Sequence, residues 1–293
     1  MWWGTNYPAR YWWNGGAFLR MDWLAFAMIG ICLVKRDRPA AGGFALAYSA
    51  LLRVFPGFIV AGLALKVLAT WVAERRIGLA APVRRFVAGA LVAVAVLVPV
   101  SVALAPGHGV DAFAGFIDNS RKHLETPLTN NMGLKTVVAY DARTRVRVTV
   151  DPAQPDPFGT WKDARRRTFA DRKIIYLAVL AGMLALVAWA ARPAPEWVAL
   201  TLGVGLIPFL AELTCYYYSF LLAFAFLWPR RRVIGAALCA VSAMTCAMPW
   251  IAWWDDARYV NISGYVLAFV AVATALTRWP RGQLGADQGN SRA

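Results

Sequence analysis

Apolar residues along this chain come in long blocks rather than in the alternating or three-to-four spacing of a water-soluble domain. A helix needs about 20 mostly apolar residues to cross the hydrocarbon core of a bilayer, and shorter helices fit inside a bundle. Nine segments have this character, at 18–34, 40–54, 57–73, 86–105, 174–191, 196–212, 214–228, 233–251 and 258–277. The pattern predicts an all-α fold, a polytopic membrane bundle of about nine transmembrane helices with one long external loop.

Composition and charge distribution agree with this prediction. The chain is 59% hydrophobic and 16% charged, whereas soluble domains are nearer half apolar and a quarter charged. Its net charge of +15 would suggest a nucleic-acid partner in a soluble protein. Here 14 of the 31 basic residues fall in alternate short loops or in the tail: Lys35, Arg36, Arg38, Arg75, Arg76, Arg84, Arg85, Arg192, Arg230, Arg231, Arg232, Arg278, Arg281 and Arg292. Cytoplasmic loops are enriched in Lys and Arg, so these residues orient the helices and no nucleic acid is needed.

The chain divides into four parts. Residues 1–106 hold an interfacial amino-terminal segment and transmembrane helices 1–4, and residues 107–173 form the external loop. Residues 174–278 hold helices 5–9, and 279–293 form a cytoplasmic tail. The amino terminus and the loop are expected outside, because loops of this length are translocated largely regardless of charge.

The long loop carries 12 Lys+Arg and 8 Asp+Glu and has two halves. Apolar residues in 110–140, interrupted by Pro127 and Gly133, are typical of short amphipathic helices on a membrane surface. In 143–150 they alternate with a period of two, which favours either a small hairpin or a disordered loop. A turn-rich segment, 151–157, follows.

The amino terminus is rich in aromatic residues, with four Trp and two Tyr in residues 1–14. Such residues belong at a membrane–water interface. The segment has no features of a cleavable signal peptide. An external tail without a signal suggests that earlier helices are missing from this chain.

Ionisable residues in or beside the apolar segments are candidates for function, since each costs roughly 2.5–3.5 kcal/mol at mid-bilayer unless paired or hydrated. These are Arg20, Asp22, Arg53, Lys66 and Glu212. By the predicted topology all except Lys66 face the outer side, where they would converge on one site. Structural roles are the alternatives: Arg20 as an interfacial anchor, Lys66 snorkelling along its helix, and Arg53 paired with Glu212.

The external loop adds polar candidates. Arg121, Lys122, His123 and Lys135 could hold a phosphate, and Asn130 and Asn131 could hydrogen-bond sugar hydroxyls. The alternative is a basic amphipathic helix on anionic headgroups. The cysteines lie in apolar runs and there are only two histidines, so no metal site is expected, and no nucleotide-binding or soluble hydrolase motif is present.

Four short stretches carry a resemblance to a known family. They are Leu19–Leu24, Lys35–Gly43 with its basic and small residues, Ala47–Pro56 with a cation ahead of a proline, and the aromatic Leu213–Leu222. Their order resembles GT-C-type integral membrane glycosyltransferases, in particular the family 87 polyprenol-phosphate-mannose-dependent mannosyltransferases. The resemblance implies inverting transfer of a hexose, mannose in that family, from a polyprenyl-phosphate donor on the outer face of the bacterial inner membrane. Beyond the bilayer and this lipid-linked sugar, it implies no cofactor.

The resemblance also implies roles for single residues. Arg53 matches the family cation that neutralises the donor phosphate, and Asp22 is the nearest acid, with Glu212 as the other acid–base candidate. Tyr217 and the polar loop residues would contact sugar or acceptor. The acidic external loop that follows the family's first helix has no counterpart, which implies a chain lacking its amino-terminal part or a degenerate relative. The rival class is a non-enzymatic multi-pass protein, a transporter or lipid-binding scaffold.

Overall fold

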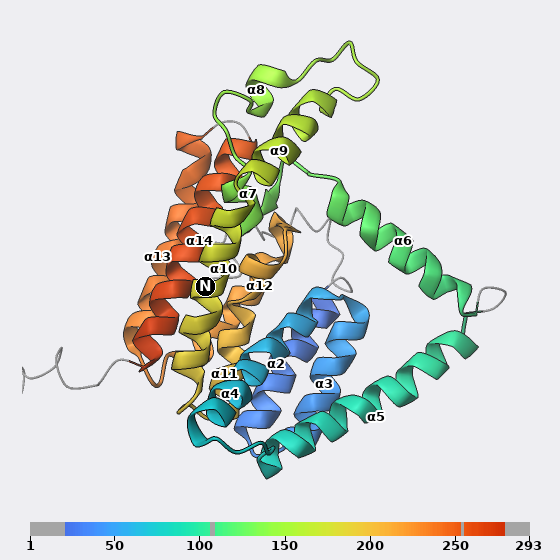
Figure 1. Ribbon diagram of the computed structural model, residues 1–293, viewed down its shortest axis with the longest axis vertical. Helices are drawn as coiled ribbons and strands as arrows, with labels where there is room; N and C mark the ends of the chain where they lie inside the picture. Colours follow the sequence, from blue (N-terminus) through green and yellow to red (C-terminus); the bar gives the residue numbers. More distant parts are fainter. Residues whose placement is uncertain (1–20, 106–108, 253–254, 279–293) are drawn as a thin grey trace, which may run out of the picture.

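The computed structural model describes residues 21–105, 109–252 and 255–278, which are mostly helical (Figure 1). The first part contains α2 (Asp22–Lys35), α3 (Pro39–Leu52), the 3-10 helix η4 (Phe55–Phe58), α4 (Ile59–Glu74) and α5 (Ala81–Ala103). The polar stretch contains α6 (Asp111–Glu125), β1 (Asn131–Met132), α7 (Leu134–Val138), α8 (Val146–Thr149) and α9 (Gly159–Asp171). The last part contains α10 (Lys173–Ala191), α11 (Glu196–Val204), α12 (Ile207–Leu210), β2 (Leu213–Thr214), the 3-10 helix η5 (Cys215–Leu227), α13 (Arg232–Ile251) and α14 (Asp255–Arg278).

Five helical segments within the described residues are long and apolar enough to cross a membrane, not the nine predicted. They are Phe55–Glu74, Ala81–Ala103, Lys173–Ala191, Arg232–Ile251 and Asp256–Arg278. The described fold is therefore that of a helical, multi-pass membrane protein in contact with the bilayer. Nine apolar segments are present in the sequence, but their composition does not show how long each helix is.

The other four predicted segments are helical but short. Helices α2 and α3 have 14 residues each, which is about 21 Å of helix against a hydrocarbon core of about 30 Å. The segment 196–212 is divided into α11 and α12 by a turn in which Leu206 N donates to Gly203 O. Apolar composition predicted these helices, but not where they break.

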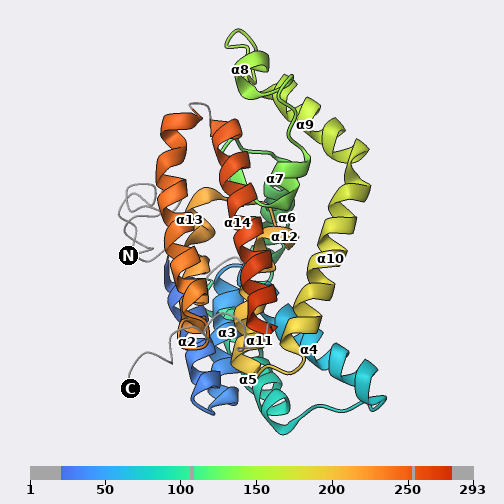
Figure 2. The same ribbon diagram turned by 90° about the vertical axis from the view of Figure 1, so that its left-hand side faces the viewer.

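The bundle has two chemically different ends (Figures 1 and 2). The α2–α3, α4–α5, α10–α11 and η5–α13 connections lie at one end together with the last turn of α14. We call this the basic end, because these connections and the helix ends beside them carry the described members of the basic set above. Segments α7 to α9, the β1–β2 pair and the α13–α14 connection lie at the opposite end, which we call the loop end.

The long polar stretch is more ordered than its alternating pattern predicted. Neither a hairpin nor a disordered loop forms at 143–150, because Val148 N and Thr149 N donate to Arg145 O and close the helical turn α8. The predicted amphipathic helix is α6, which has Phe113, Phe116 and Ile117 at helical spacing. Figure 1 shows α6 set apart from the rest of the bundle, with its carboxyl end leading back toward α7.

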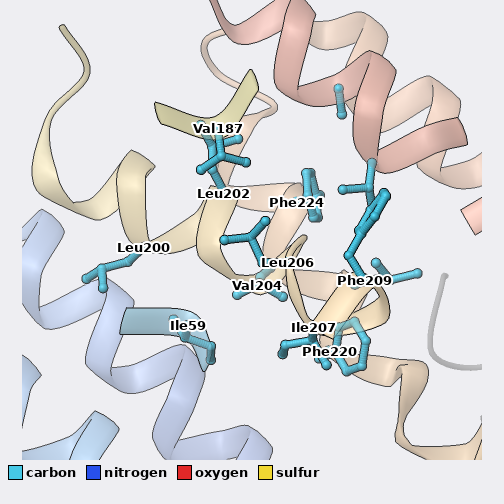
Figure 3. Packing of buried hydrophobic residues seen from close by; sticks show 14 of the residues in the cluster. Ile59, Val187, Leu200, Leu202, Val204, Leu206, Ile207, Phe209, Phe220 and Phe224 are labelled. Atoms are coloured by element: carbon cyan, nitrogen blue, oxygen red, sulfur yellow. The ribbon is translucent and has the colours of Figure 1, made fainter. Parts of the chain in front are cut away.

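Glycines allow α4 and α11 to cross in contact. A Cβ atom on Gly62 would lie 2.0 Å from Ala199 O, and one on Gly203 would lie 2.0 Å from Ile59 O. Close backbone approach at small residues is a common way for membrane helices to associate. Buried side chains of α4, α10, α11, α12 and η5 pack around this crossing, as Figure 3 shows for Ile59, Val187, Leu202, Leu206 and Phe224.

We expect Gly203→Ala to lower the free energy of unfolding by about 1–3 kcal/mol, because the added methyl group overlaps a backbone oxygen that cannot rotate away. Gly182→Ala in α10 is the matched control, since a Cβ there meets nothing within 4 Å and alanine favours helix. Thermal unfolding of the detergent-purified chain compares them. A Gly203→Ala variant as stable as Gly182→Ala would contradict the crossing.

Candidate functional site

The candidate site forms where the chain stops being helical between α12 and η5. Ala211 is extended, and β2 pairs antiparallel with β1 in the register Asn131↔Thr214 and Met132↔Leu213. Cys215 N then donates to Asn130 O at 3.0 Å. The polar loop thus supplies hydrogen-bond partners for backbone groups that the interrupted helix leaves unpaired. Away from water, such groups need partners within the protein.

Gly133 lets the loop turn immediately after β1. Its φ of 126° is unfavourable for any residue with a side chain, and a Cβ would lie 2.8 Å from Pro208 O. Its N–H donates to Ser263 Oγ of α14 at 3.1 Å. The turn therefore fixes the start of α7 against α12 and α14.

A buried cluster of charges occupies this break. Glu212 is 7% exposed, and its Oε1 accepts hydrogen bonds from Arg165 Nη2 of α9 and from Thr136 Oγ1, the latter at 2.9 Å. Lys135 Nζ lies 3.4 Å from the other oxygen, Oε2. Arg165 Nη2 also donates to Thr136 Oγ1 at 3.2 Å. Two cations thus share one carboxylate, and the cluster carries a net charge of +1.

The two cations are held differently. Lys135 lies 5.4 Å from the centre of the Phe169 ring and is 33% exposed, so it remains accessible to a ligand. Arg165 is 6% exposed and lies 5.4 Å from the Trp161 ring. Its Nε is buried and has no hydrogen-bond partner among the described residues. Lys135, whose ammonium group has three donors, is therefore the cation of this cluster that a further anion could reach.

A second cluster, of aromatic rings, joins three segments at the start of α2, at η4 and at η5. Ring centres are 4.8 Å apart for Trp23 and Phe55, 5.0 Å for Phe55 and Tyr217, and 4.6 Å for Tyr216 and Tyr217. Asp22 directly precedes Trp23, and Arg53 lies two residues before Phe55. Because Glu212 lies five residues before Tyr217, the chain connects this aromatic cluster to the charge cluster.

The predicted site residues accordingly fall into groups. Lys135 and Glu212 meet directly, and Asn130 and Asn131 lie beside them at the strand pair. Asp22, Arg53 and Tyr217 lie at or beside the aromatic cluster. The side chains of Arg121 and His123, and all of Arg20, lie outside the described residues, while exposed Lys122 is near the carboxyl end of α6, a helix set apart from the bundle.

The structure differs from two of the structural alternatives raised above. Glu212 does not pair with Arg53 but with Arg165 and Lys135, and Arg53 is exposed without an ion-pair partner among the described residues. Lys66 does not merely snorkel: it donates to Ala194 O and lies 3.7 Å from Glu196 at the basic end.

Sequence reasoning missed Arg165 and Asp256. Trp161, Arg165 and Phe169 are spaced by four residues and so share one face of α9, which was a signal that Arg165 is packed rather than solvated. Asp256 is 1% exposed and accepts a hydrogen bond from Val146 N at 2.7 Å, which ties α8 to the start of α14. In the sequence Asp255 and Asp256 stand together between two apolar segments, and nothing there indicates that Asp256 is buried.

Two neighbouring groups outside the membrane-spanning helices have shifted pKa values. Burial raises the pKa of Tyr140, and the Asp256 carboxylate raises it further by repelling the phenolate. Hydrogen bonds from the Arg143 side chain and backbone lower the pKa of Asp141 to about 2. Both shifts favour the Tyr140 phenol and the Asp141 carboxylate at neutral pH.

Comparison with protein-family models, curated proteins and solved structures finds no match for this chain. Within the described residues, no group of three His, Cys, Asp or Glu side chains could hold a metal ion.

We expect Glu212→Gln to lower the free energy of unfolding by about 3–5 kcal/mol, because it leaves Arg165 buried beside a neutral group. Asp163→Asn is the control: it removes the exposed ion pair with Arg166 and should cost less than about 1 kcal/mol. Unfolding by denaturing detergent measures both. Equal stabilities would show that the buried pair does not hold the loop on the bundle.

Proposed function

We propose that this chain is a membrane glycosyltransferase, or the sugar-lipid-binding part of one. The sugar is a hexose, which the resemblance implies to be mannose, and its donor is a polyprenyl phosphate bound at the loop end. The reaction takes place on the outer face of the bacterial inner membrane. One observation carries the proposal: Lys135 and Arg165 share the single carboxylate of Glu212, and Lys135 remains partly exposed to a ligand.

A polyprenyl-phosphate sugar matches this arrangement in three ways. Its hydrocarbon tail stays in the bilayer beside the apolar helices, so its phosphate sits at membrane-surface depth. Lys135, and Arg53 as a second exposed cation, supply charge for that phosphate, while Asn130 and Asn131 supply amide donors for hydroxyl groups. Tyr217, half-buried among aromatic rings, offers a face for the sugar ring.

The two acids take different roles. Both oxygens of Glu212 already contact Arg165, Thr136 or Lys135, so Glu212 positions the cations rather than accepting a proton. Asp22 is half-buried, and its Oδ1 accepts a hydrogen bond from Trp23 N at 2.8 Å. Its other oxygen is the general-base candidate.

In the proposed reaction Asp22 accepts the proton of an acceptor hydroxyl group. The acceptor oxygen bonds to the anomeric carbon as the bond from that carbon to the phosphate oxygen breaks. The bonding pair leaves with polyprenyl phosphate, whose added charge Lys135 and Arg53 neutralise. Attack opposite the leaving group inverts the anomeric configuration.

We expect Lys135→Gln to reduce consumption of radiolabelled mannosyl-phosphate polyprenol about 10- to 100-fold in membrane vesicles containing the chain, because one charge-assisted hydrogen bond to the phosphate is lost. Lys173→Gln, an exposed lysine at the start of α10, is the matched control and should act like the unchanged chain.

Asp22→Asn separates binding from chemistry: it should abolish consumption but leave retention of the labelled donor intact. If the unchanged chain retains the donor without consuming it, a lipid-binding scaffold replaces the transferase. If it does neither, the proposal falls altogether.

A further inference from the structure

A pocket of about 520 Å³ opens at the basic end, far from the charge cluster. Its walls come from the last turns of α4, the α4–α5 connection, the start of α5, the α10–α11 connection and the final residue of α14. Elements distant in the sequence therefore form one concave site.

The lining combines apolar residues with three basic and two acidic residues. Lys66, Arg192 and Arg278 face two carboxylates, Glu74 and Glu196. Lys66 is engaged by Glu196 at 3.7 Å and by Ala194 O. This leaves two guanidinium groups against Glu74, which is exposed at the end of α4. Guanidinium groups bind phosphate through paired hydrogen bonds. The excess of positive charge in the lining therefore favours an anionic phosphate ligand.

Aromatic residues indicate the depth of the pocket in the membrane. Trp71 lines it, and its indole N–H donates to Gly78 O at 2.5 Å. Arg278 lies 5.1 Å from the Trp189 ring and donates to Trp189 O at 2.9 Å. Tryptophan beside cations is typical of the headgroup level of a bilayer.

Exposed apolar side chains flank the polar lining. Leu68 and Val72 on α4 and Ile77 in the following connection are 53%, 72% and 88% exposed. A polar pocket bordered by lipid-facing apolar groups matches a molecule with a charged head and a hydrocarbon tail. Free phosphate would use only the first of these features.

We propose that the pocket binds the headgroup of an anionic phospholipid. Arg192 and Arg278 contact its phosphate, the Lys66–Glu196 pair forms the floor, and the acyl chains lie along the exposed face of α4. Basic pockets between membrane helices are suited to such headgroups. The site is independent of the proposed transferase activity, because it lies at the opposite end of the bundle.

The test titrates the detergent-purified full chain with dioleoyl phosphatidylglycerol and counts retained lipid by native mass spectrometry. The unchanged chain should retain one phosphatidylglycerol at least about tenfold more tightly than phosphatidylcholine. Arg192→Gln with Arg278→Gln should remove this preference, since each cation near a membrane surface contributes roughly a factor of five. Arg36→Gln with Arg85→Gln, two exposed arginines at the same end but outside the pocket, should leave it within about twofold.

A second pair of variants keeps the test valid if the arginine variants fold poorly. A side chain at Gly78 meets open space, so Gly78→Glu and Gly78→Gln place the same shape at the pocket with and without a negative charge. Only Gly78→Glu should bind phosphatidylglycerol about tenfold more weakly than the unchanged chain. Equal losses of phosphatidylglycerol binding in the pocket and control variants would overturn the proposal. Glycerol phosphate competing as strongly as phosphatidylglycerol would also overturn it, because the pocket would then be a free-phosphate site.

Discussion

The break between α12 and η5 is the constraint on which the loop end depends. A non-helical backbone beside the membrane must find hydrogen-bond partners within the protein. Asn131 and Met132 supply them by pairing with Thr214 and Leu213. The polar loop is therefore a structural part of the bundle rather than an appendage, and its backbone pairs with the chain at the break between α12 and η5.

The same break determines the electrostatics. Burying the Glu212 carboxylate without partners would be costly, so two cations from the loop accompany it. They come from α7 and α9, which are far apart in the sequence and meet only because the strand pair and Gly133 fix α7 against the bundle. The excess of one positive charge follows from this folding requirement, and a phosphate ligand would use what the fold already needs.

Apolar blocks located nearly all the long helices to within a few residues, since lipid-facing helices must be apolar along their length. They did not reveal that 196–212 breaks at Gly205, because glycine is common in membrane helices and packs against Val270 and Phe224 here. Residues 143–150 alternated like a strand but form α8, whose Val146 N–H is held by Asp256. Lys135 and Glu212 were identifiable as candidates, and the spacing of Trp161 and Phe169 marks Arg165 as a packed residue. That Arg165 reaches Glu212 depended on how α9 meets the bundle, which no pattern in the sequence shows.

Helix α10 connects the two chemically distinct ends. Near its start, Tyr176 donates to Phe209 O beside the break, and near its end Trp189 O accepts from Arg278 at the pocket. Its 19 residues span about 28 Å, well beyond the Debye length of about 8 Å at physiological salt. Direct electrostatic coupling between exposed charges at the two ends is therefore small. An anion bound at one end would therefore act mainly on the cations of that end.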